Sequence, residues 1–357
     1  MNTRLKFLLA NVFTCIISYS ALAQTEFSVG QITVINLGDG RLLFRTLTDD
    51  KPIEGEHRIM DGYNSEYISA QFAKGLYDGK YERYKHNRLV EKGVYKEGVR
   101  NGAFVEYYSD GAVKSEKTFT DGKLNGVLKT YFTNGKPEIE QSYKNGVEDG
   151  IERRWHWETG QLTVDAKYAD GKPDGKQTRY ISSNNGDYVE ISNFVKGVQT
   201  GEFSQTWTNG QVRVQGKYKD GKKDGIWIEY RKNGKPEKST TYKNGERNGE
   251  YKTFFTDGTV EKTENYLDGQ REGVSKEFFY DSGKVKNEYT YTNNVKSGKY
   301  KMYYDDGTLR EEGRCDDGKE VYRKEYYKNG KVKEISERNS RGGWEILESY
   351  DSDGKQK

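Results

Sequence analysis

The feature that most constrains this chain is a regular recurrence of glycine. A first set of glycines returns every 23 to 26 residues, with Asn294 in one slot. This set comprises Gly75, Gly98, Gly122, Gly146, Gly171, Gly197, Gly221, Gly245, Gly269 and Gly318. A second set follows each first-set position except the last by four residues, and a third set, from Gly111 to Gly354, lies half a period on. Such a period predicts tandem copies of one small structural unit.

Asparagine or aspartate precedes many of these glycines, which indicates tight turns. Asn145-Gly146 represents the first set and Asn134-Gly135 the third. These dipeptides tolerate the positive φ that we expect at both central residues of a tight hairpin turn. The segments between turns are rich in Tyr, Phe, Thr, Val and Lys with alternation, as in Thr130-Tyr131-Phe132, which is typical of short strands. The chain after residue 23 is therefore predicted to be all-β.

An aromatic residue stands three positions before each first-set position except the last. These residues are Phe72, Tyr95, Phe119, Tyr143, Tyr168, Phe194, Tyr218, Tyr242, Tyr266 and Tyr291. One hairpin of ~24 residues is too small to be stable alone, so neighbours must stack and align these rings as a ladder. Cys315 takes the ladder position in its own repeat. That position favours a small buried apolar residue over a reactive or intermolecular thiol.

The pattern Tyr-x-(Asn/Asp)-Gly-x-x-x-Gly resembles the MORN repeat, specifically its bacterial variant. The segments from Tyr143 to Gly150 and from Tyr242 to Gly249 carry it well. The resemblance covers residues 49–357, about twelve and a half repeats. It implies an extended, single-layer, twisted antiparallel sheet of tandem hairpins that acts as a binding or scaffolding surface. Some relatives are labelled YwqK-type antitoxins, a role that fits an exported chain poorly.

The first 23 residues read as a secretory signal peptide. Arg4 and Lys6 form a basic start, a mostly apolar run follows, and Ala21-Leu22-Ala23 fits the small-x-small rule for cleavage. Polar residues interrupt the run, which disfavours an uncleaved anchor, and Cys15 lacks the small preceding residue of a lipoprotein site. We expect export to the periplasm, the cell surface or the outside. The mature chain then comprises a lead-in at 24–48 and the array at 49–357, with no membrane span.

Charge and composition exclude several classes of function. Without residues 1–23, 57 Lys and Arg face 56 Asp and Glu, a balance that excludes a nucleic-acid binder with a dense basic surface. His57, His86 and His156 are scattered, and Cys315 is the one cysteine left, which leaves no material for a catalytic triad or a Cys/His metal site. We therefore predict no catalytic residue, no metal and no cofactor, and the chain is not expected to be an enzyme.

Tryptophan is spread unevenly, and we interpret its clustering as a partner-binding patch. Four of the five tryptophans lie where the repeat spacing is longest: Trp155, Trp157, Trp207 and Trp227. Trp207 and Trp227 sit at odd offsets from the row of Tyr230 and its equivalents, which predicts exposed indoles on the opposite face. Two alternatives remain open. Tryptophan could fill ladder positions, as is plausible for Trp155, or a bulge before Gly210 could return Trp207 to the ladder.

These observations favour an exported, non-enzymatic repeat protein that offers an extended protein-binding or scaffolding surface. The identity of the protein partner does not follow from the sequence. A carbohydrate-binding or cell-wall-binding array is the alternative, because secreted aromatic–glycine repeats also stack sugars. An antitoxin-like or immunity-like partner of a toxin is a second alternative.

Overall fold

A computed structural model describes residues 25–357, which form one large, open, mostly antiparallel sheet of hairpins without an α-helix. The all-β prediction is confirmed. The predicted signal peptide and Cys15 lie outside the described residues. Within residues 25–357, no helix has the length and apolar character needed to cross a membrane.

The described residues divide into two compact units. The first comprises residues 25–113 and 119–122, and the second comprises residues 114–118 and 123–357. The first unit contains β1 (Thr25–Ser28), the 3-10 helix η1 (Val29–Gln31), β2 (Ile32–Asn36), β3 (Leu42–Thr46), β4 (Gly55–Asp61), β5 (Glu66–Ala73), β6 (Leu76–Lys85), β7 (Arg88–Lys96), β8 (Val99–Arg100) and β9 (Gly102–Tyr107). Strand β10 (Val113–Thr120) has residues in both units.

The second unit is the longer series of hairpins. Its strands are β11 (Lys123–Leu124), β12 (Gly126–Tyr131), β13 (Pro137–Lys144), β14 (Val147–Trp155), β15 (Leu162–Ala169), β16 (Lys172–Pro173), β17 (Gly175–Ile181), β18 (Tyr188–Val195), β19 (Val198–Gln199), β20 (Gly201–Trp207), β21 (Val212–Lys219), β22 (Lys222–Tyr230), β23 (Pro236–Lys243), β24 (Glu246–Phe254), β25 (Val260–Leu267), β26 (Gln270–Arg271), β27 (Gly273–Phe278), β28 (Val285–Thr292), β29 (Val295–Tyr303), β30 (Leu309–Asp316), β31 (Lys319–Tyr326), β32 (Val332–Arg338) and β33 (Trp344–Ser349).

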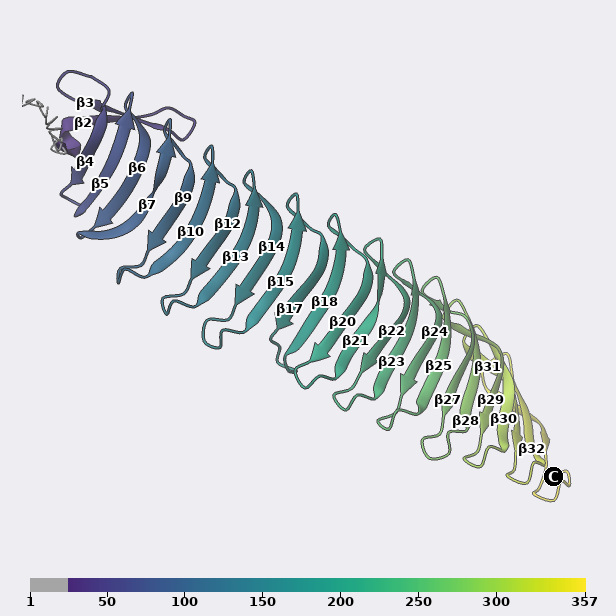
Figure 1. Cartoon of the computed structure of the whole chain (residues 1–357). Coiled ribbons are helices and arrows are strands. Elements are labelled where there is room, and N and C mark those ends of the chain that lie inside the picture. Colours follow the sequence, from purple (N-terminus) through teal and green to yellow (C-terminus); the bar gives the residue numbers. More distant parts are fainter. Residues whose placement is uncertain (1–24) are drawn as a thin grey trace, which may run out of the picture. The chain divides into compact units, whose positions relative to one another are not determined.

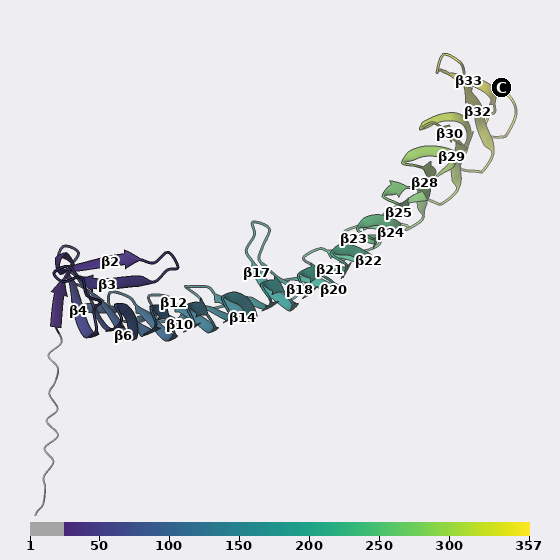
Figure 2. The same cartoon turned by 90° about the horizontal axis from the view of Figure 1, so that it is seen from above.

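In the first unit, a separate hairpin of β2 and β3 lies over the main sheet (Figure 2). Strand β1 joins that sheet by parallel pairing with β4. Phe44 of β3 is 4% exposed and packs against the rings of Phe72 at 5.3 Å and Tyr77 at 4.8 Å. The Phe44 N–H also donates a hydrogen bond of 2.7 Å to the Gly75 carbonyl oxygen. The segment expected as a lead-in therefore covers the first aromatic residues of the array.

The first-set turns have the expected geometry. Asn145 and Gly146 have φ of 52° and 85°, and Lys144 pairs with Val147 across them, which defines a two-residue type I′ turn. Asn294 adopts the same left-handed conformation, with φ of 69°. Asparagine can therefore replace glycine in this slot because its short polar side chain tolerates that conformation.

The third-set turns are built differently. Gly135 has φ of 78°, whereas Asn134 keeps a negative φ. The Phe132 N–H donates to the Lys136 carbonyl oxygen at 2.9 Å, and the Gly135 N–H donates to the Phe132 carbonyl oxygen at 2.9 Å. The expectation of two positive φ values is wrong at such turns, because this longer loop needs only glycine in the left-handed region.

The second unit is a series of successive hairpins (Figure 1), and backbone hydrogen bonds at the first-set turns join each hairpin to the one before it. The Gly146 N–H donates to the Leu124 carbonyl oxygen at 2.7 Å, and the Gly245 N–H donates to that of Lys223 at 2.9 Å. The same bond recurs at Gly171, Gly197, Gly221, Gly269, Asn294 and Gly318. These bonds use only main-chain atoms, so they fix the stacking of hairpins whatever side chains the repeats carry.

Candidate functional site

Aromatic rings pack in a row on one face of the second unit, which we call the ring face. In β20–β24 the row contains Phe203, Trp227 and Tyr251, each two residues after a second-set glycine. The Trp227 ring lies 5.3 Å from Phe203 and contacts two predicted ladder residues, Tyr218 at 5.0 Å and Tyr242 at 6.5 Å. The predicted ladder therefore forms only half of a wider packed row.

Trp227 is buried, so the expectation of an exposed indole is wrong for this residue. Its side chain is 4% exposed, and its Nε1 donates to the Lys217 carbonyl oxygen at 3.1 Å. Gly216 makes room for the ring, because a Cβ there would come within 2.3 Å of it. Gly313 serves Tyr300 in the same way, at 2.6 Å. Trp227 is a packing residue of the ring face.

Cations cover the rings of this row. The Lys223 Nζ lies 4.2 Å from the Trp227 ring centroid and 5.2 Å from that of Tyr242. Arg247 lies over Tyr251 at 5.1 Å in the next hairpin. Such contacts add roughly 0.5–1 kcal/mol each at partly exposed sites. The basic residues of this face therefore serve packing and leave few free charges.

The ring row is interrupted in β14 and β17. The positions equivalent to Trp227 hold Glu152 and Gln177, which are 5% and 1% exposed. Glu152 accepts a hydrogen bond of 2.6 Å from the Arg154 Nε. The Gln177 Nε2 donates to the Lys167 carbonyl oxygen at 2.8 Å, whereas its Oε1 has no partner among the described residues. Two consecutive hairpins therefore have polar groups at the position where the following hairpins, β20–β24, have rings.

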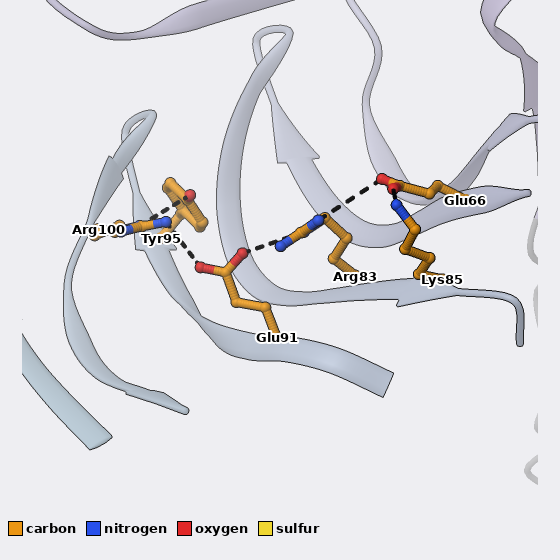
Figure 3. A network of polar contacts seen from close by, with 6 residues as sticks. All are labelled: Glu66, Arg83, Lys85, Glu91, Tyr95 and Arg100. Carbon is orange, nitrogen blue, oxygen red and sulfur yellow. Dashed lines mark hydrogen bonds and ion pairs between the residues drawn. The ribbon is translucent and has the colours of Figure 1, made fainter. Parts of the chain in front are cut away.

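A buried carboxylate in the first unit is part of an ion-pair network (Figure 3). Glu91 is 5% exposed and lies 2.8 Å from the Arg100 Nη2 and 3.4 Å from the Arg83 Nε. Arg83 also approaches Glu66, which pairs with Lys85 at 2.8 Å. Because guanidinium groups neutralise Glu91 on both sides, this arrangement is typical of a structural charge network.

The four predicted partner-binding tryptophans fall into three different rows. Trp227 lies in the ring row. Trp155 has an odd offset from Glu152, so it projects from the opposite face, where it lines a hollow with Tyr131. Trp157 and Trp207 each stand three residues before a third-set glycine. The structure therefore does not gather the four indoles into one patch, and their role in partner binding stays a prediction.

Residues at this last offset form a second series at the third-set turns, which we call the edge row. In the second unit it consists of Phe132, Trp157, Ser183, Trp207, Arg231, Phe255, Tyr280, Tyr304 and Tyr327. Trp157 is 56% exposed and Tyr280 is 51% exposed. Both lie in turns that are one residue longer, where the N–H of the preceding residue, His156 or Phe279, makes the bond that the Trp207 N–H makes in its own turn. The other aromatic members of the edge row are partly buried.

Several edge-row side chains bond to the following hairpin. The hydroxyl groups of Tyr304 and Tyr327 donate to main-chain carbonyl oxygens, each at 2.9 Å. Arg231 makes the equivalent bond from its Nη2 to the Phe254 carbonyl oxygen, also at 2.9 Å. The buried Trp207 Nε1 has no partner among the described residues. Trp207 thus lacks the bond that Tyr304, Tyr327 and Arg231 make.

Trp207 lines a hollow of ≈ 460 Å³ on the ring face, beside the third-set turns. Its ring meets Tyr188 edge-on at 6.1 Å, and their strands pair Tyr188 with Trp207. Arg213 lies 4.6 Å from the Tyr188 centroid and 5.1 Å from that of Trp207, while the Lys232 Nζ lies 5.2 Å from Trp207. Trp207 shares a face with Phe203, four residues earlier, so the face predicted for it is correct. Its side chain is partly buried, whereas an exposed indole was expected.

Cys315 lies in the ladder as a buried free thiol, 3% exposed. Burial raises the pKa of the Cys315 thiol, and the nearby Glu320 carboxylate adds to this shift. Residues 25–357 contain no group of three or more His, Cys, Asp or Glu side chains placed to hold a metal ion.

The packed row has a sequence signal of its own, separate from that of the ladder. A large residue stands two positions after many second-set glycines, as in Gly201-Glu202-Phe203 and Gly225-Ile226-Trp227. Trp227 lies on the face opposite Tyr230, as its odd offset predicted, but the row of Tyr230 is not the buried one. A Gly-x-aromatic pattern read across repeats would have identified the buried face.

The architecture defines a protein of tandem β-hairpin repeats. Seven of these repeats match the MORN repeat variant family, at residues 100–121, 124–145, 223–244, 247–268, 272–293, 296–314 and 319–339. The chain is a MORN-repeat protein, as the sequence pattern predicted. No enzyme family matches it, and MORN-repeat proteins are generally non-catalytic. No curated protein sequence matches the chain.

The chain is also similar to parts of larger solved structures. The crystal structure of TcdB2-TccC3 aligns at 10% identity over 88% of this chain and 23% of that one, with a TM-score of 0.13. The same complex without its hypervariable C-terminal region aligns at 11% identity over 88% and 22%, with a TM-score of 0.17. The chain spans less than a quarter of the length of either match.

Proposed function

We propose that this protein is an exported, non-enzymatic MORN-repeat protein whose edge row binds another protein. The observation that carries the proposal is the contrast between two aromatic series. Phe203 and Trp227 of the ring row are buried and needed for packing, whereas Trp157 and Tyr280 of the edge row are more than half exposed. Exposed aromatic side chains repeated along one surface are typical of protein-binding sites. Export rests on the signal-peptide pattern of residues 1–23.

The test is capture of a specific protein from an envelope extract by the mature chain. The Trp157→Ala variant should lose most of the captured protein with little change in melting temperature, because the indole is solvent-exposed. Tyr63→Ala is the matched control, since Tyr63 is 97% exposed but lies outside the edge row. Retention of the mature chain on peptidoglycan or polysaccharide, with no protein captured, would contradict the proposal and favour carbohydrate binding.

A further inference from the structure

The hollow beside Trp207 has more positive charge than its own acids neutralise. Two carboxylates line it, and both are paired: Glu237 with Arg231 at 3.2 Å, and Glu229 with Lys238 at 2.8 Å. Arg213 and Lys232 also line it, and neither has a carboxylate within ion-pair distance among the described residues. Arg213 instead donates to the neutral side chain of Gln205. Two cations therefore face the hollow without an anion.

Unsatisfied hydrogen-bond donors gather at the same place. Four buried side-chain nitrogen or oxygen atoms have no hydrogen-bond partner in the part of the chain that the structure describes. Two of the four, Trp207 Nε1 and Arg231 Nε, belong to residues that line this hollow, and both are N–H donors. A buried donor without an acceptor costs about 1–3 kcal/mol, so a small shift of the Trp207 and Arg231 side chains that lets these donors reach an acceptor in the hollow recovers that free energy.

We propose that this hollow binds the side-chain carboxylate of an acidic peptide segment. The proposal rests on the proposed protein-binding function and names the chemistry of the partner at this point. A carboxylate supplies both the negative charge that Arg213 and Lys232 face and the acceptor oxygens for the orphan donors. Arg213 and Lys232 lie over the Trp207 ring, so a sugar has little free ring face on which to stack.

A second hollow of similar size serves as an internal control. It measures ≈ 480 Å³ and is lined by edge-row residues Phe255 and Tyr280 together with Lys262 and Lys286. Lys262 pairs with Glu264 at 2.8 Å, and no lining residue of this hollow carries an orphan buried donor in the described chain. Lys286 makes no ion pair among the described residues, but Glu261 and Glu277 also line this hollow, so two lysines face two carboxylates there. This second hollow has the aromatic wall but no net positive charge, so it should not select a carboxylate.

The experiment is a calorimetric titration of the mature chain with a hexa-glutamate peptide. We expect binding that weakens as salt rises from 50 to 500 mM, because the attraction is between charges near the surface. Arg213→Gln combined with Lys232→Gln should weaken binding about tenfold or more. Lys286→Gln, in the control hollow, should leave affinity unchanged. Trp207→Phe keeps a ring but removes the orphan Nε1 donor, and it should weaken binding about threefold.

Two outcomes would overturn the proposal. One is that oligogalacturonate binds at this hollow and the peptide does not. The other is that the paired Gln substitutions leave peptide affinity unchanged in a folded protein. Both are distinct from failure of the proposed function. The proposed function is tested by whether the Trp157→Ala variant loses the protein captured from an envelope extract. The carboxylate site is tested by whether the purified chain binds the peptide through Arg213 and Lys232.

Discussion

Two stretches of the second unit have the same turns and the same backbone bonds between hairpins, but one stretch packs aromatic rings where the other buries polar side chains. In β20–β24 the row holds Phe203, Trp227 and Tyr251, while β14 and β17 hold Glu152 and Gln177 at the equivalent positions. The Gly245 N–H in the first stretch and the Gly171 N–H in the second nevertheless make the same bond to the preceding hairpin, at 2.9 and 2.8 Å.

The difference separates what specifies the stacking from what stabilises it. The turn bonds are indifferent to side chains, so they hold the register of a hairpin even where the interior is polar. Ring burial supplies the larger energy, because each fully buried aromatic side chain contributes about 1.5–3 kcal/mol. We therefore expect the array to be regular in geometry and uneven in local stability, with β14–β18 as its weaker part.

The largest expected effect is truncation of the central ring. Trp227→Ala should lower the free energy of unfolding by about 3–5 kcal/mol, because it leaves a cavity above Gly216. The corresponding Gln177→Ala should cost about 1 kcal/mol or less, since one hydrogen bond is lost and one orphan oxygen is removed. Urea unfolding followed by far-UV circular dichroism measures both. Equal losses in the two variants would break the comparison.

A smaller effect is expected from the glycine beneath that ring. Gly216→Ala should destabilise the protein by about 1–3 kcal/mol, because its Cβ would come within 2.3 Å of the Trp227 ring and force it to shift. Gly62→Ala is the control, since nothing lies within 4 Å of a Cβ there and Gly62 has no positive φ. If the Gly216→Ala and Gly62→Ala variants had the same melting temperature, the tight fit of Gly216 against the Trp227 ring would be refuted.

The sequence predicted the repeat and its hairpins because turn chemistry is local. Asn145-Gly146 needs no distant contact to adopt its type I′ conformation, and the period alone aligns the ladder residues. The burial of Trp227 could not be predicted in this way. It depends on which face the chain covers, and both faces carry aromatic residues, such as Tyr218 on one and Tyr230 on the other.

The candidate site was predictable only in part. The offset of Trp157 and Trp207 from a third-set glycine is visible in the sequence, but the longer turn at Gly160, in which His156 makes the bond that Trp207 makes at Gly210, is not. The uncompensated charge of Arg213 and Lys232 is not visible, because the chain has nearly as many acids as bases. It appears only once the register places Glu229 beside Lys238 and Glu237 beside Arg231.

The free energy of unfolding should rise when the unpaired oxygen of Gln177, in the polar interruption of the ring row, is removed. Gln177→Met keeps the length of the side chain and removes the unpaired Oε1, so it should raise the free energy of unfolding by about 1 kcal/mol. The Lys167 carbonyl oxygen keeps its bond from the Asp174 N–H at 2.9 Å. Lys176→Met, at the exposed neighbouring position, should change stability by less than about 0.5 kcal/mol. A loss of stability in Gln177→Met would show that the glutamine is satisfied in solution.

The smallest effect is expected at Cys315, which fills a ladder position with a small apolar group. Cys315→Ala should cost less than about 1 kcal/mol, because little volume is removed beside Tyr300. Burial raises the pKa of the thiol, so at pH 8 the native chain should contain less thiolate than a free cysteine would. Iodoacetamide should therefore label Cys315 much more slowly in the native chain than in urea. Labelling at the same rate in both would show that the thiol is accessible, and Cys315 would then be a reactive group instead of a packing substitute for tyrosine.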